Sequence, residues 1–98
     1  MASENFIEQQ DGSFSLHGEL SFAAVPVLAA QSQVWLASGK ESITIDMADI
    51  GRADSAGLAL MLEWIKQAGQ SGQQIRFINI PGQLSSLIRV SGLDGVFD

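Results

Sequence analysis

Alternation of hydrophobic and polar residues predicts the strands in the first half of the chain. Residues 14–20 alternate in this way, which is typical of a half-buried strand. Asp11-Gly12 is a turn dipeptide, so we expect residues 5–9 to form the antiparallel partner of that strand. Residues 42–46 form a further expected strand, again apolar at every second position. Because a parallel strand covered on both faces should be apolar throughout, we expect helices mainly on one face of the sheet.

Helical spacing and helix-ending residues predict three helices. The first begins at Ser21 or Val25 and runs to about Leu36, with Pro26 in its first turn. The second runs from Ser55 to about Ala68 and is ended by Gly69 or Gly72, and a shorter helix follows Pro81-Gly82. The inward positions expected in the short helix are Leu84, Leu87 and Ile88, with Leu93 as a further candidate.

The order of these elements indicates the fold class. A strand over 74–80 separates the second and third helices, and Val96-Phe97 suggests a short final strand. Two opening strands followed by alternating helices and strands predict an α/β fold with a mixed, mainly parallel sheet and right-handed crossovers.

The composition is that of a soluble globular protein. The chain has 98 residues, 46% of them apolar and 16% charged, so we expect a single domain over 1–98 with its own core. There is no Cys, which suits a reducing compartment. The N-terminal residues do not resemble an export signal, and the apolar runs are short, so we expect a cytoplasmic protein without direct membrane insertion.

The net charge of −6 bears on the choice of partner. Only five residues are Lys or Arg, and nucleic-acid binding needs them clustered, so we do not expect a nucleic-acid partner. The acidic balance favours a protein partner with a basic patch, or serves solubility alone.

The start of the second helix is the candidate binding surface. At 100° per residue its inward side contains Leu58, Met61, Leu62 and Ile65. The outward side contains Ser55, Ala56, Ala59, Glu63, Lys66, Gln67 and Gln70, with Leu60 on the boundary. We expect Ala56, Ala59 and the edge of Leu60, beside Gly57, to form a flat, weakly apolar patch. The simpler alternative is that alanine is present as the best helix former, and that Asp54 or Ser55 only caps the helix.

Residue types suited to catalysis are scarce. His17 is the single His and is expected on the solvent side of its strand. A Ser–His–Asp triad is formally allowed, but no G-x-S-x-G motif accompanies it, and the chain has no P-loop. We therefore predict no catalytic residue, no metal site and no cofactor.

Several segments together resemble the STAS domain, the sulfate-transporter and anti-sigma-factor-antagonist family. They are Gly18-Glu19-Leu20, the early Pro26, residues 45–47 leading into Asp54-Ser55-Ala56-Gly57-Leu58, and finally residues 89–93. The resemblance covers nearly the whole chain and implies a four- to five-stranded sheet with helices mainly on one face. It also implies an interaction module rather than an enzyme.

One position separates two branches of this family. Anti-sigma-factor antagonists carry a phosphorylated Ser just before the Gly, where this chain has Ala56. Ser55 retains a hydroxyl one residue earlier and is a candidate phosphorylation site. The segment from Asp54 to Trp64 is similar to the MlaB-like branch, whose members are cytoplasmic subunits of phospholipid ABC transporters.

The MlaB-like branch implies a partner and a site. The partner would be the Mla-type ATPase subunit, which places the protein at the inner membrane through that subunit. The expected partner-binding residues are Asp54, Ser55, Ala56, Gly57, Ala59 and Leu60. The alternative is an anti-sigma-factor antagonist that binds a serine kinase.

Overall fold

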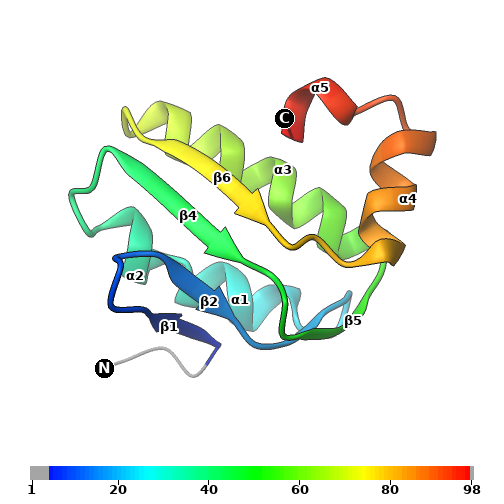
Figure 1. The fold of residues 1–98 in the computed structure, drawn as a ribbon, viewed down its shortest axis with the longest axis horizontal. Helices are drawn as coiled ribbons and strands as arrows, with labels where there is room; N and C mark the ends of the chain where they lie inside the picture. The colour runs from blue at the N-terminus through cyan, green and yellow to red at the C-terminus, as the bar shows by residue number, and fades with distance from the viewer. Residues whose placement is uncertain (1–4, 98) are drawn as a thin grey trace.

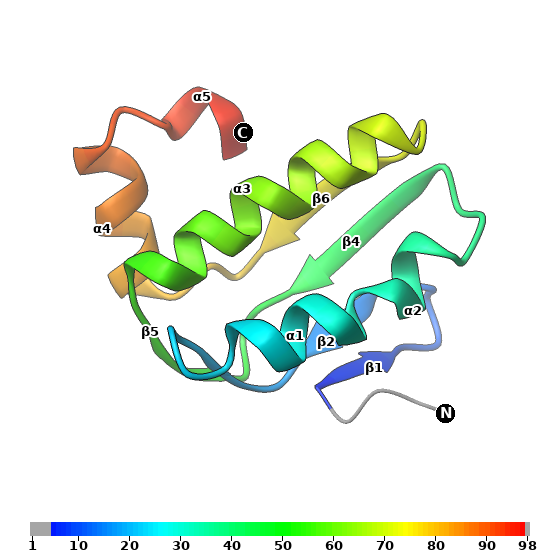
Figure 2. The same ribbon diagram turned by 180° about the vertical axis from the view of Figure 1, so that it is seen from behind.

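The computed structural model describes residues 5–97, which form a one-sided α/β fold. Its main sheet has four strands in the order β1-β2-β4-β6, of which β1 is antiparallel to β2 and the other neighbours are parallel. The strands are β1 (Phe6–Glu8), β2 (Phe14–Leu16), β4 (Ser42–Asp46) and β6 (Gln74–Ile78). Figures 1 and 2 show that the long helices lie on one face of the sheet and leave the other face open. The expected fold class and one-sided covering are confirmed.

The expected strand over 14–20 is divided in two. Its second half is β3 (Gly18–Leu20), which leaves the main sheet and pairs in parallel with β5 (Ile50–Ala53). The chain turns at Gly18, whose φ of +99° is a left-handed conformation that favours glycine. A Cβ atom at Gly18 would also lie 2.9 Å from the side-chain Nδ2 of Asn5. Strand β5 was not predicted, because its residues have the composition of a polar connector.

The first expected helix is also divided. It begins at Val25, so the alternative start at Ser21 is wrong, and it consists of α1 (Val25–Gln31) and α2 (Gln33–Leu36). Ser32 lies at the junction, where its hydroxyl donates a 2.6 Å hydrogen bond to the carbonyl oxygen of Ala29. Such bonds from Ser back to the preceding turn compete with regular helical bonding and bend helices.

The second half of the chain follows the prediction more closely. It contains α3 (Ser55–Gln70) and α4 (Gly82–Val90). Of the residues expected to face inward, Leu84 and Ile88 are buried, whereas Leu87 and Leu93 are only half-buried. Strand β6 ends at Ile78, two residues early, because Asn79 adopts a positive φ of 55° and donates through Nδ2 to Asp46. The expected final strand is wrong, since its residues belong to α5 (Asp94–Phe97).

The core lies between the sheet and the helix layer. Aromatic rings cross it from edge to edge: Trp64 of α3 makes T-shaped contacts with Phe6 of β1 and Trp35 of α2, and stacks with Phe77 of β6. Leu58 and Met61 are buried as expected, whereas Leu62 and Ile65 are only half-buried. The buried stripe of α3 is therefore rotated towards Trp64, because α1 and α4 flank the helix in addition to the sheet.

Gly57 sets how closely α3 approaches β3. A Cβ atom at this position would lie 2.2 Å from the carbonyl oxygen and 2.7 Å from the Cγ atom of Leu20. Both distances are far shorter than van der Waals contact, so only glycine allows this approach. Leu20 is itself fully buried, which leaves it little room to move.

We expect Gly57→Ala to lower the free energy of unfolding by about 3 kcal/mol or more, because α3 must move away from backbone atoms of β3. Urea denaturation followed by circular dichroism measures this change. Gly69→Ala, in the same helix with open space around the added methyl group, is the matched control and should be neutral or stabilising by up to about 1 kcal/mol. Equal effects of the two substitutions would show that helix propensity, not close packing, governs Gly57.

Candidate functional site

The candidate site is a groove between α1 and α3, with a volume of about 640 Å³. Figure 2 shows these two helices side by side in the helix layer. One wall comes from the first turn of α1 and the segment before it, and the other comes from the first half of α3. The lining residues, which define the α1–α3 groove, are Phe22, Ala23, Val25, Pro26, Ala29, Ala56, Ala59, Leu60 and Glu63.

The α1–α3 groove is apolar, lined mainly by short side chains, and open to solvent. Four of its residues are alanines, so the helices approach without long side chains filling the space between them. Glu63 is the one charged residue in its lining. Phe22, at the rim of the groove, is 80% exposed, although burial of a phenylalanine side chain is favourable. An exposed aromatic ring beside an apolar groove is typical of a protein-binding surface.

Asp54 joins the two walls of the groove. Its Oδ1 atom caps α3 by accepting hydrogen bonds from the backbone N–H groups of Ala56 and Gly57, at 2.9 and 3.2 Å. Its Oδ2 atom accepts from the backbone N–H of Phe22 at 3.1 Å. One carboxylate therefore holds the exposed Phe22 segment against the start of α3.

The same hydrogen bonds affect the acidity of Asp54. The N–H of Phe22 contributes most to holding the pKa of Asp54 below its usual value of 3.8, and the N–H groups of Gly57 and Ala56 act in the same direction. Partial desolvation opposes them by favouring the neutral acid. The net effect favours the carboxylate, which is the form that can accept all three bonds.

The six residues expected to bind a partner have different roles in the structure. Ala56, Ala59 and Leu60 line the groove, although Leu60 is buried rather than at a surface boundary. Asp54 is the cap of α3, which settles the choice between Asp54 and Ser55. Ser55 is exposed but does not line the groove, and Gly57 faces Leu20 in the interior. The expected flat patch is in fact one wall of a hollow.

The residues of the α1 wall were not among the predicted binding residues. Phe22, Ala23, Val25, Pro26 and Ala29 were treated only as parts of a helix and its start. The one available signal was the apolar run over residues 22–25, just before Pro26. Segments that only begin a helix are usually more polar than this. Nothing in the sequence places this run beside Ala56.

A polar cluster lies on the open face of the sheet. The Oγ atom of Ser15 lies 2.9 Å from Nε2 of His17, and Nδ1 of His17 lies 3.6 Å from Oδ2 of Asp49. These are the residue types of a catalytic triad, but Ser15 is only 7% exposed in the middle of β2, whereas a nucleophile must reach its substrate. The cluster instead ties the loop after β4 to β2. His17, expected to be solvated, is half-buried within it.

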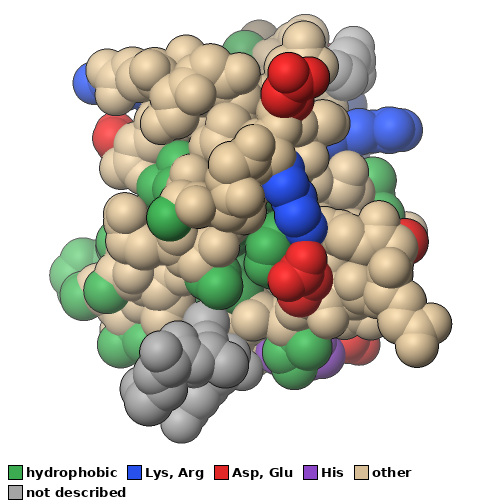
Figure 3. All heavy atoms as spheres, turned by 90° about the vertical axis from the view of Figure 1, so that its left-hand side faces the viewer, with side chains coloured by type: hydrophobic (Ala, Val, Ile, Leu, Met, Phe, Trp, Pro, Cys, Tyr) green, Lys and Arg blue, Asp and Glu red, His purple; other side chains and the backbone are tan. Residues whose placement is uncertain are grey.

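Residues 5–97 contain neither a candidate metal site nor a candidate membrane span. In that range no group of three or more His, Asp or Glu side chains is arranged to hold a metal ion. No helix within it has the length and apolar character needed to cross a membrane. On the face shown in Figure 3, the Lys and Arg side chains are separated from one another, with Asp and Glu among them.

Solved structures of other proteins contain domains with a similar fold. The structure described as "The overall structure of SLC26A9" superposes with a TM-score of 0.74 at 15% identity, covering 88% of this chain and 17% of that one. "Crystal Structure Analysis of Mglu" gives a TM-score of 0.63 at 16% identity, covering 84% of this chain and 21% of that one. At these identities the likeness shows the fold alone, that of a small mixed α/β domain, and this chain spans only about a fifth of either structure's length.

The sequence gives the family. The family model described as "Mlab, STAS domain" matches residues 6–98, which is nearly the whole chain. The chain therefore belongs to the MlaB-like STAS family. Among curated proteins, no sequence matches it.

The lowered pKa of Asp54 predicts a pH dependence of stability. The pKa of Asp54 is lower in the folded protein than in the unfolded chain. The carboxylate therefore stabilises the native protein fully at pH values above the unfolded-state pKa. This contribution is lost as the pH falls through the folded pKa. Asp54→Asn does not titrate, so its stability should fall less steeply than that of the wild type between about pH 5 and pH 2.

Urea denaturation across this pH range tests the prediction. Asp11, whose pKa is also lowered, mainly by the hydroxyl of Ser13, titrates in the same direction but is present in both proteins. The difference between the two curves therefore reports Asp54. Curves that run parallel at all pH values would contradict the proposed bonding of the carboxylate.

Proposed function

We propose that this protein is a non-catalytic adaptor subunit that binds the ATPase of a phospholipid-transporting, Mla-type ABC transporter through the α1–α3 groove. The observation that carries the proposal is the exposed Phe22 ring beside an apolar groove, in a chain of the MlaB-like STAS family. In this role the protein would be cytoplasmic and would lie at the inner membrane through its partner.

The shape of the groove supports a macromolecular partner. It is open, and its walls are the outer surfaces of two helices, as in grooves that receive a helix of another protein. Its alanines allow a partner's backbone to approach closely, and Phe22 is positioned to act as an anchor. Glu63 at the wall favours a partner with a basic residue beside its apolar contact.

Ala56 supports an adaptor over a phosphorylation switch. It lines the groove where a phosphorylated family member would carry the modified hydroxyl, so the surface here is permanently apolar. The second candidate function, an anti-sigma-factor antagonist, depends on Ser55, which is exposed at the first position of α3. A phosphate there would add negative charge beside Asp54 and next to Ala56, which lines the groove.

Affinity purification of the tagged protein from its native cells distinguishes these functions. Recovery of an ABC ATPase together with its permease would support the adaptor proposal. Recovery of a sigma-regulating kinase, with a mass increase of one phosphate on Ser55 after incubation with that kinase and ATP, would favour the antagonist. Recovery of neither partner from cells that express both would contradict both candidate functions.

Variants of the groove test the site itself. Ala59→Arg should weaken binding to the purified ATPase by roughly tenfold or more, because a long charged side chain would fill the α1–α3 groove. Arginine is a good helix former, so the fold should be retained. Gln70→Arg, at the exposed end of the same helix, is the matched control and should change affinity by less than about twofold.

Phe22→Ala provides a second measurement of the same surface. Because Phe22 is exposed, its removal should leave the free energy of unfolding within about 0.5 kcal/mol of the wild type. If the ring is an anchor, calorimetric titration with the ATPase should show a loss of about tenfold or more in affinity. Unchanged affinity in both Phe22→Ala and Ala59→Arg would place the ATPase contact elsewhere.

A further inference from the structure

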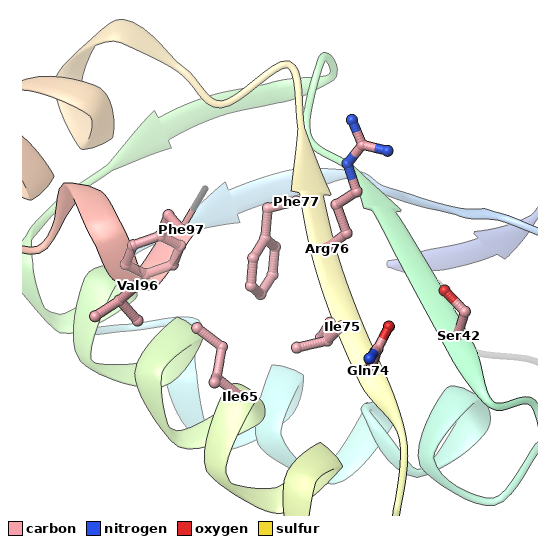
Figure 4. Close-up of a pocket in the computed structure, with 8 residues that line it drawn as sticks. All are labelled: Ser42, Ile65, Gln74, Ile75, Arg76, Phe77, Val96 and Phe97. Carbon is pink, nitrogen blue, oxygen red and sulfur yellow. The ribbon is translucent and has the colours of Figure 1, made fainter.

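A second surface lies at the opposite side of α3, along the free edge of the sheet. A pocket of about 430 Å³, the β6 edge pocket, lies beside β6, the last strand in the sheet order. Its lining residues are Ser42, Ile65, Gln74, Ile75, Arg76, Phe77, Val96 and Phe97, shown in Figure 4. None of them lines the α1–α3 groove, so the two surfaces are separate.

The backbone of β6 presents unpaired hydrogen-bonding groups to this pocket. In a strand, the N–H and C=O groups of successive residues point alternately to the two sides. Gln74 and Ile78 direct theirs towards β4, because the N–H of Gln74 bonds Glu41 and the C=O of Ile78 accepts from Met47. Ile75 and Phe77 therefore direct theirs away from β4, to the edge where no described strand pairs with them. Such an edge is a template for another strand.

The side chains along this edge divide into two kinds. Figure 4 shows Ile75 and Phe77 on the side of Ile65, Val96 and Phe97, and Arg76 directed to the other side of β6. Phe97 packs against Phe77 with ring centroids 5.8 Å apart, which gives the pocket an apolar floor. Arg76 is exposed and makes no ion pair with any residue in 5–97. The edge thus offers an apolar surface on one face and an unpaired positive charge on the other.

We propose that the open edge of β6 binds an extended segment of a partner protein in which apolar and acidic residues alternate. The segment would add a strand to the sheet by pairing with the backbone of Ile75 and Phe77. Because side chains of neighbouring strands share faces, its apolar residues would enter the β6 edge pocket and an acidic residue would lie beside Arg76. This is β-strand addition, in which the main chain supplies affinity and the alternating side chains supply specificity.

The charge on Arg76 selects this occupant over a second copy of the chain. Two copies joined in antiparallel fashion about Arg76 would place this arginine opposite itself, which is repulsive. An acidic segment instead gains a charge-assisted contact. The arginine also stands out because the chain as a whole is acidic, with a net charge of −6.

The test uses a capped peptide of about eight residues that alternates valine and glutamate, the length of an ordinary strand. Saturable binding in NMR titration of the full chain should shift the amide signals of Ile75 and Phe77 most, and should leave those of Phe22 and Ala59 unchanged. A peptide N-methylated at alternate residues, which cannot donate the backbone bonds, should not bind. Failure to bind the peptide at millimolar concentration, or shifts centred on Phe22, would overturn the proposal.

A charge exchange tests the role of Arg76. Arg76→Glu should weaken binding of the glutamate peptide by roughly fivefold, and a matching valine–lysine peptide should then bind this variant better than the wild type. Arg89→Glu, an identical charge change at the end of α4 outside the pocket lining, is the control and should leave both affinities unchanged.

Two other results would also count against the proposal. Equal weakening by Arg76→Glu and Arg89→Glu would indicate a general charge effect rather than a site. A concentration-dependent dimer in sedimentation, dissociated by Arg76→Glu, would assign the edge to a second copy of the chain.

Should Arg76→Glu not fold, Arg76→Gln makes the same comparison with a neutral side chain. None of these measurements depends on the ATPase, so their outcome is independent of the proposed adaptor role.

Discussion

The close contact between the end of β3 and the start of α3 is the constraint on which the rest of the structure depends. Gly57 allows α3 to lie against Leu20, and the carbonyl of Leu20 accepts the backbone N–H of Asp54 at 3.2 Å. Asp54 then bonds Phe22, two residues further along the same segment. The contact that packs the helix onto the small β3–β5 ladder therefore also brings the α1 wall beside the α3 wall. The α1–α3 groove follows from this packing.

One-sided covering of the sheet explains the other surface features. With all long helices on one face, the open face carries polar groups that bond one another, such as His17 with Ser15 and Asp46 with Asn79. Among residues 5–97 no strand pairs with the outer edge of β6, because the chain forms α5 there and packs Phe97 on Phe77. Helix α3 separates this edge from the groove, so two partners could be bound without competition.

Local sequence patterns predicted the secondary structure correctly where several local signals agreed. The helix over α3, the helix after Pro81 and the strand over 42–46 were predicted because periodic apolar residues and strong end signals agree there. The errors lie where a distant contact decided the conformation. Gly18 turns the chain out of the main sheet beside Asn5, and β5 forms only because β3 lies next to it. Val96-Phe97 has strand composition but packs as a helical turn against Phe77.

The sequence by itself determined the family, the one-sided α/β fold and the absence of a hydroxyl at Ala56, because these depend on residue identity and local periodicity. It also identified three residues of the α3 wall of the candidate site, since Ala56, Ala59 and Leu60 follow from helical spacing. Only the tertiary structure decided that this wall faces Phe22 and Pro26, and that Gly57 is a packing residue rather than a surface one. The physical reason is that a groove is formed by two segments, and the packing at Leu20 and Asp54 that joins them has no signature in either segment alone.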